Sequence, residues 1–106
     1  MIQTILTLIA IHLVCDYPFQ SDAIATGKNR NIDPAKFGVP WFYWLSSHAA
    51  THGLFVGIFL NNFYAGLFEF TSHFIIDYCK CEKYFGIHID QCLHIFCKIL
   101  IVIFFI

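Results

Sequence analysis

Four pairs of ionisable side chains recur at helical spacing within the apolar stretches of this sequence. The pairs are His12 with Asp16, His48 with His52, His73 with Asp77, and Asp90 with His94. Residues four apart lie on one face of a helix, so each pair predicts a helix with a polar face. Ionisable groups are costly inside an apolar membrane span and are usually kept for a function. The fold therefore has to bring these four faces together, away from lipid.

The composition places these helices in a membrane. Of the 106 residues, 58% are hydrophobic and only 12% are charged, whereas soluble domains have about 25% charged residues. The length allows one domain with about four spans of some 20 residues each. The net charge of −1 argues against nucleic-acid binding. We therefore predict an all-α, four-helix transmembrane bundle, in contact with the lipid bilayer, as a single domain over residues 1–106.

Prolines and a short polar turn divide the chain into helices. Pro18 ends the first helix, Pro40 precedes the second, and Asn61 with Asn62 forms a tight turn that sends the third helix back antiparallel. The first long connection has room for a short interfacial helix. The predicted spans are about residues 2–19, 41–60, 63–78 and 88–106, and the long connections are residues 20–40 and 79–87.

Positive charge predicts how the bundle is oriented. The two long connections, which lie on one side of the membrane, contain Lys28, Arg30, Lys36, Lys80 and Lys83. The other side, with both termini and the short asparagine turn, has no Lys or Arg. The positive-inside rule makes the charged side cytoplasmic. Both termini are therefore expected outside the cytoplasm.

Residue counting predicts that the polar faces meet at one depth. At 1.5 Å per residue, one imidazole from each helix lies roughly 8 to 12 Å below the charged side, and three carboxylates lie roughly 2 to 6 Å below it. The imidazoles are His12, His48, His73 and His94, with His52 deeper, and the carboxylates are Asp16, Asp77 and Asp90. The first and third helices share H-x3-D-Y and run the same way, so two hairpins related by an axis along the membrane normal would form one site.

Imidazole combined with carboxylate favours a divalent transition metal, zinc first, with iron, manganese or cobalt as alternatives. Eight candidate ligands exceed the four of one tetrahedral site, so either two ions bind or some of the side chains orient the ligands. The eight are the members of the four pairs. Asp16 or Asp90, where not a ligand, could act as a general base. Gln20 and Gln91 could position water or substrate.

Two further features are interpreted as structural. Glu69 and Lys98 lie about 9 and 12 Å from the uncharged side, and we expect them to pair, because an unpaired charge there would be strongly destabilising. Ala49, Gly53 and Gly57 form a stripe of small residues that suits close packing of helices, or alternatively a homodimer.

At these motifs the chain resembles a family of small bacterial and phage membrane proteins, domain of unknown function 3307. The family pattern is H-x3-D-[FY]-x2-Q with a later Lys, then a His, then H-x3-D and D-Q-x2-H. The matching residues here are His12, Asp16, Tyr17, Gln20, Lys28, His48 with or without His52, His73, Asp77, Asp90, Gln91 and His94. Ser-Asp-Ala follows Gln20 where an aromatic residue is expected. The resemblance implies a four-helix integral membrane protein, in a bacterial inner membrane or that of a phage-infected host, and supplies no reaction.

Three functions remain open from the sequence. The first is a membrane-embedded, metal-dependent hydrolase at the cytoplasmic leaflet, acting on a lipid or phosphoester. The second is a transporter or channel for protons or metal ions that uses the same residues. The far leaflet argues against it, because only Glu69 and Lys98 are ionisable there. The third is a small membrane binding or regulatory protein, in which the polar layer only specifies the bundle.

Overall fold

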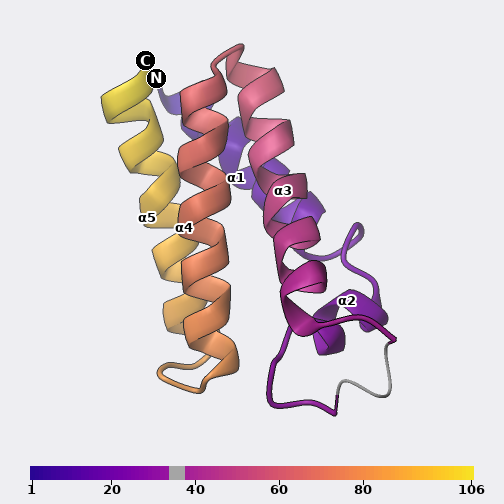
Figure 1. Cartoon of the computed structure of the whole chain (residues 1–106). Helices are drawn as coiled ribbons and strands as arrows, with labels where there is room; N and C mark the ends of the chain where they lie inside the picture. Colours follow the sequence, from indigo (N-terminus) through magenta and orange to yellow (C-terminus); the bar gives the residue numbers. More distant parts are fainter. Residues whose placement is uncertain (34–37) are drawn as a thin grey trace.

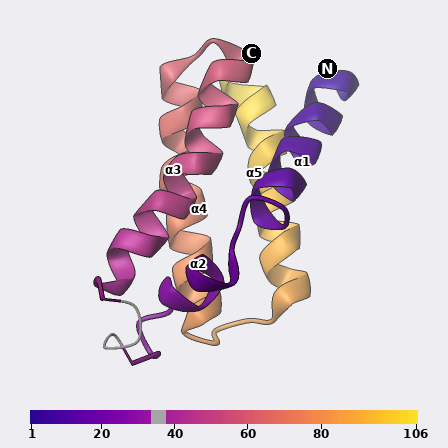
Figure 2. The same ribbon diagram turned by 90° about the vertical axis from the view of Figure 1, so that its right-hand side faces the viewer.

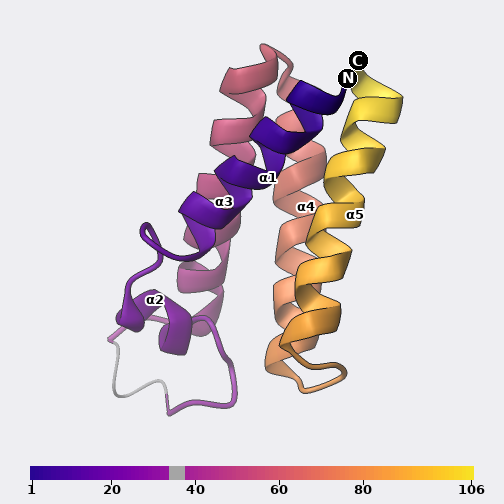
Figure 3. The same cartoon turned by 180° about the vertical axis from the view of Figure 1, so that it is seen from behind.

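Five helices and no strand make up the part of the chain that the computed structural model describes, residues 1–33 and 38–106. They are α1 (Ile2–Asp16), α2 (Asp22–Gly27), α3 (Trp41–Leu60), α4 (Phe63–Cys81) and α5 (Ile87–Phe105). The α3, α4 and α5 helices run roughly along one axis and α1 is inclined to them, with both termini at one end and the short α2 toward the other (Figures 1 and 3). The predicted all-α class is confirmed. Lys36, one of the predicted cytoplasmic charges, lies outside the described residues.

Local sequence explains where these helices begin and end. The α1 helix ends at Asp16 rather than near residue 19, because Pro18 lacks an N–H and restricts the residue before it. Between α3 and α4, Asn61 adopts a left-handed conformation with φ of 48°. The side chain of Asn62 then accepts hydrogen bonds from two backbone N–H groups in the first turn of α4. This turn makes α3 and α4 an antiparallel hairpin.

The long helices follow one another around the bundle in the order α1, α3, α4, α5, with α5 beside α1. The α1 and α4 helices are thus at opposite corners, and both run away from the end that holds the termini (Figure 2). That is the arrangement expected for two hairpins related by an axis along the bundle. It turns the two copies of H-x3-D toward each other.

Small residues bring α3 and α4 into close contact. A Cβ atom added to Gly53 would lie only 2.7 Å from the backbone oxygen of Gly66, and Ala49 on the same face is fully buried. The stripe predicted from Ala49, Gly53 and Gly57 therefore packs at least in part within the chain. A homodimer through these residues stays a prediction.

The apolar side chains are divided between a small core and the outside of the bundle. The buried core lies toward the end with the termini and consists of Leu8, Val56, Ala65, Ile101 and Val102. Large apolar side chains cover the outer faces, for example Ile58, Ile103 and Phe104, which are 60 to 72% exposed. Such a large apolar exterior suits contact with lipid or with another protein.

Among the described helices, one, α5, is long and apolar enough to be a candidate membrane span. The α1 helix is apolar but has 15 residues. The α3 and α4 helices are long, but polar site residues such as His48 and Asp77 make them less apolar. The predicted four-span bundle is therefore supported only as an all-helical protein with one candidate span.

Candidate metal centre

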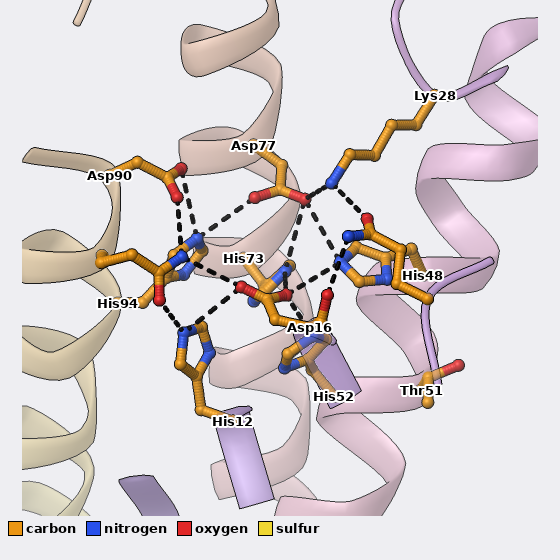
Figure 4. Close-up of polar contacts among 12 residues, drawn as sticks. His12, Asp16, Lys28, His48, Thr51, His52, His73, Asp77, Asp90 and His94 are labelled. Carbon is orange, nitrogen blue, oxygen red and sulfur yellow. Dashed lines mark hydrogen bonds and ion pairs between the residues drawn. The ribbon is translucent and has the colours of Figure 1, made fainter. Parts of the chain in front are cut away.

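Each of the four long helices contributes one of the predicted pairs to a single buried cluster. The side chains point toward one another between the helices, with Asp16 and Asp77 near the middle (Figure 4). The exposed fraction is 8% for Asp16 and 2% or less for His12, His48, His52, His73, Asp77, Asp90 and His94. The structure thus brings together all eight residues predicted from the spacing.

The carboxylate of Asp16 is surrounded by imidazoles. Its Oδ1 atom lies 3.1 Å from Nε2 of His48 and 3.0 Å from Nε2 of His52. The same oxygen lies 3.6 Å from Nε2 of His73. The other oxygen, Oδ2, lies 3.3 Å from Nε2 of His12, one turn earlier in α1. Asp16 therefore connects α1 with both α3 and α4.

Asp77, at the equivalent place in the second H-x3-D copy, makes a matching set of contacts. Its Oδ1 atom lies 3.1 Å from Nε2 of His94. Its Oδ2 atom lies 3.4 Å from Nε2 of both His48 and His73. Each aspartate thus faces the histidine of its own helix and at least one from the long helix that follows. The repeat seen in the sequence is present in the geometry.

Gln91 links the cluster residues of α1 to Asp90 on α5. Its Nε2 group donates to Oδ2 of Asp16 at 3.1 Å and to Oδ2 of Asp90 at 3.0 Å. Its Oε1 atom lies 2.9 Å from Nε2 of His12. The other oxygen of Asp90 lies 3.5 Å from Nε2 of His94 and has no hydrogen-bond partner. Gln91 therefore fixes the orientation of Asp90 while one carboxylate oxygen stays available.

Glu69 and Lys98 form the predicted ion pair, and Glu69 also contacts two histidines of the cluster. Lys98 Nζ donates to Oε1 of Glu69, and both side chains are buried. The same carboxylate oxygen lies 3.5 Å from Nδ1 of His73 and 3.9 Å from Nδ1 of His52. A carboxylate on the outer nitrogen of an imidazole orients the ring toward a metal. The position of Glu69, four residues before His73, was the signal for this contact, and interpreting the pair as purely structural missed it.

Lys28 enters the cluster from the connection between α1 and α3. Its Nζ atom donates to Oδ2 of Asp77 at 2.6 Å and to Oε1 of Gln20 at 2.7 Å. Gln20 in turn donates to the backbone oxygen of Asp16. Helical spacing gave no reason to place Lys28 in the site, because it lies outside the four apolar helices. The family pattern alone contained it.

The segment that contains Lys28 is held against the bundle on both sides. Gly27 packs so closely on Trp44 that an added Cβ atom would lie 2.6 Å from the indole ring. Arg30 forms a two-bonded ion pair with Glu82 just beyond α4, and its guanidinium holds the pKa of that carboxyl below its usual range. Asn31 also donates to the backbone oxygen of Cys81. These contacts place the Lys28 ammonium over the cluster.

A cavity of about 120 Å³ leads from the cluster toward this end of the bundle. Its lining residues are Asp16, Tyr17, Gln20, Lys28, Asp77, Lys80, Ile87, Asp90 and Gln91. It gives a small ligand access to the aspartates and to both predicted glutamines.

The donor atoms fit a metal ion. Among the described residues, three groups have ligand atoms within 4.8 Å of one another: His12, Asp16, His52 and His73; His48, His73 and Asp77; and Asp77, Asp90 and His94. Both ring nitrogens of His52 and of His73 are buried, and their contacts with carboxylate oxygens, at 3.0–3.9 Å, lack the geometry of hydrogen bonds. Leaving a buried polar group unsatisfied costs about 1–3 kcal/mol. A bound cation would satisfy several of these atoms at once.

The buried charged groups have an excess of negative charge that a cation would balance. In the described part of the chain the buried carboxylates are Asp16, Glu69, Asp77 and Asp90, and the buried ammonium groups are Lys28 and Lys98. With neutral imidazoles the formal charge of these six groups is −2. Buried charge is strongly destabilising without a partner. One divalent ion, or protonation of two imidazoles, would neutralise the cluster.

A family model described as protein of unknown function (DUF3307) matches residues 4–106 of the chain. The match covers essentially the whole chain, as the resemblance of the motifs predicts. No curated protein and no solved structure shows a significant match.

Proposed function

The chain belongs to the DUF3307 family, whose description states no activity, and we propose from its site that it is a membrane-embedded hydrolase dependent on a divalent metal ion. The ion would bind between α1, α3, α4 and α5. One observation carries the proposal: eight buried imidazoles and carboxylates converge in a cluster whose buried groups have a formal charge of −2 with neutral imidazoles. Zinc suits this donor set best, with iron or manganese as alternatives, as one ion or two.

In this proposal all four long helices cross the membrane. The α3 helix has 20 residues and α4 has 19, and about 20 helical residues span a hydrocarbon core of about 30 Å. The apolar exterior and the shared end of the termini support the same arrangement. Lys28, Arg30, Lys80 and Lys83 lie at the opposite end, which the positive-inside rule makes cytoplasmic. The site would then open to the cytoplasmic leaflet of a bacterial inner membrane or of an infected host.

Asp16 and Asp77 are assigned to the metal, since each faces several imidazoles. A divalent ion supplies Lewis acidity and makes water nucleophilic near neutral pH. Asp90, the candidate general base, lines the cavity and has an oxygen without a hydrogen bond. It accepts a proton from water as the water oxygen bonds to a phosphoryl or carbonyl centre. The same proton then goes to the leaving oxygen as the ester bond breaks.

Transport of protons or metal ions is the second candidate. Two protonated imidazoles would also balance the formal charge of −2, which is the observation in its favour. Against it, the buried layer beyond the Glu69–Lys98 pair consists of apolar side chains such as Leu8, Val56 and Ile101. A path across the membrane would need polar groups there. A binding protein without catalysis is the third possibility.

The metal content of protein purified in detergent without chelators tests the proposal. We expect one or two ions per chain in the wild type and loss of the metal in His73→Ala and Asp77→Ala. His88→Ala is the matched control, because His88 is exposed on α5 and outside the cluster, and it should keep the metal.

The two alternatives give different results. Ion flux into liposomes that depends on His73 would replace the hydrolase with a transporter. Full biological activity of both His73→Ala and Asp77→Ala would exclude the hydrolase and the transporter and support a binding protein.

A further inference from the structure

We propose that the cavity beside the metal centre is a phosphoryl-binding site, in which Lys28 and Lys80 bind the anionic group of a phosphate ester. This inference names the substrate class of the proposed hydrolase and rests on that proposed function. It selects a phosphate ester over a carboxylic ester or an amide.

The size of the cavity suits one small polar group. Its volume of about 120 Å³ corresponds to about four water molecules at about 30 Å³ each. Tyr17 at the end of α1 and Ile87 at the start of α5 line it and are 58% and 44% exposed. A phosphoryl group would therefore enter the cavity, while the rest of the ester stays outside against these two side chains.

Lys28 is placed to bind an anion next to the metal ligands. Its side chain is 6% exposed, and Asp77 and Gln20 accept hydrogen bonds from its ammonium group. An ammonium group has three donors, so within the described residues one donor is left for a ligand oxygen. A cation bound to Asp77 would also weaken the attraction between that carboxylate and Lys28. The lysine would then be free to contact the ligand more closely.

Lys80 adds a second positive charge to the same cavity. It lies in the last turn of α4, three residues after Asp77, and is partly buried. Two ammonium groups beside a divalent ion suit the charge of a phosphoryl group, whereas a neutral ester would offer them no negative charge to bind. Three aspartates line the cavity as well, and they repel an anion as long as no metal ion neutralises them. Binding of metal and phosphate should therefore be coupled.

The affinity of the detergent-purified protein for Zn²⁺ tests this coupling, measured by chelator competition with and without inorganic phosphate. Phosphate should tighten zinc binding of the wild type by roughly fivefold or more, within the usual range of coupling between two ligands. In Lys80→Gln the effect should fall below twofold. Lys83→Gln is the matched control, because Lys83 is exposed in the connection that follows α4 and does not line the cavity. It should behave like the wild type. Because both variants are measured in the same buffer, binding of zinc by phosphate in solution affects their apparent zinc affinities equally and does not alter the comparison.

Equal coupling in Lys80→Gln and Lys83→Gln would overturn the phosphoryl site, as would phosphate binding of equal strength without metal. Absence of zinc binding in the wild type would instead refute the proposed function itself.

Two further probes identify the source of the phosphoryl group. Tightening by phosphatidic acid in phosphatidylcholine nanodiscs would support a lipid phosphate, and tightening by glycerol phosphate in detergent would support a soluble one.

Discussion

Removing one partner of the Glu69–Lys98 pair should destabilise the bundle strongly. Glu69 is 1% exposed and Lys98 is fully buried, so water screens neither charge. Lys98→Met leaves Glu69 as an uncompensated buried carboxylate, and breaking such a pair costs about 3–5 kcal/mol. That is a large share of the roughly 5–15 kcal/mol that stabilises a typical domain.

The double variant Glu69→Gln with Lys98→Met should recover more than half of this loss, because no buried charge is left without a partner. The assay is equilibrium unfolding in mixed micelles, followed by the loss of helical circular dichroism. Ile99→Met on the same helix is the control, since Ile99 is 37% exposed, and its effect should stay within about 0.5 kcal/mol.

The zinc affinity of the same variants tests the second role of Glu69. The carboxylate of Glu69 contacts the outer nitrogen, Nδ1, of His73. The Glu69→Gln double variant keeps an oxygen beside this nitrogen, whereas the double variant Glu69→Leu with Lys98→Met does not. The leucine variant should therefore bind zinc about 10- to 100-fold more weakly. The single variant Glu69→Gln completes a double-mutant cycle with Lys98→Met. The reasoning would be refuted if the losses of stability in the two single variants simply added up in the double variant and the two double variants also bound zinc with equal affinity.

Three further predictions concern other parts of the bundle. Lys28→Met removes a buried ammonium group, so the metal-free protein should unfold at a lower temperature and gain more thermal stability from zinc than the wild type. Gly66→Val should cost about 1–3 kcal/mol or more, because a Cβ atom there would lie 2.6 Å from the oxygen of Gly53. Gly86→Ala, where an added Cβ atom meets nothing within 4 Å, should cost less, about 1 kcal/mol at most, because alanine is a poorer N-cap residue than glycine. Asp90→Asn should slow hydrolysis by about 10²- to 10⁴-fold at unchanged metal content, and loss of the metal would instead make Asp90 a ligand.

The helices and the eight-residue cluster could be predicted because both follow from local rules. A spacing of four residues places His73 and Asp77 on one helical face whatever surrounds the helix. The asparagine turn likewise fixes the antiparallel direction of α4. Depth then follows from counting residues along each helix, which is why four separate pairs could be assigned to one layer.

Lys28 could not be predicted from spacing, because tertiary contacts determine its place. The chain returns over the site through the packing of Gly27 on Trp44 and the Arg30–Glu82 pair, and neither contact has a periodic signal. The hydropathy of α3 and α4 is ambiguous for a related reason. The polar residues of the cluster make these helices less apolar, and in the proposed membrane bundle they would therefore weaken the hydropathy signal by which spans are recognised.

X-ray absorption at the edge of the bound metal tests the central claim most directly. For zinc-loaded wild-type protein we predict a first shell of nitrogen and oxygen atoms at about 2.0–2.2 Å with the multiple scattering of imidazole, lost in His73→Ala and kept in His88→Ala. A shell dominated by sulfur at about 2.3 Å, from the cysteines, would contradict a centre built from the two H-x3-D copies, as would a spectrum unchanged by His73→Ala.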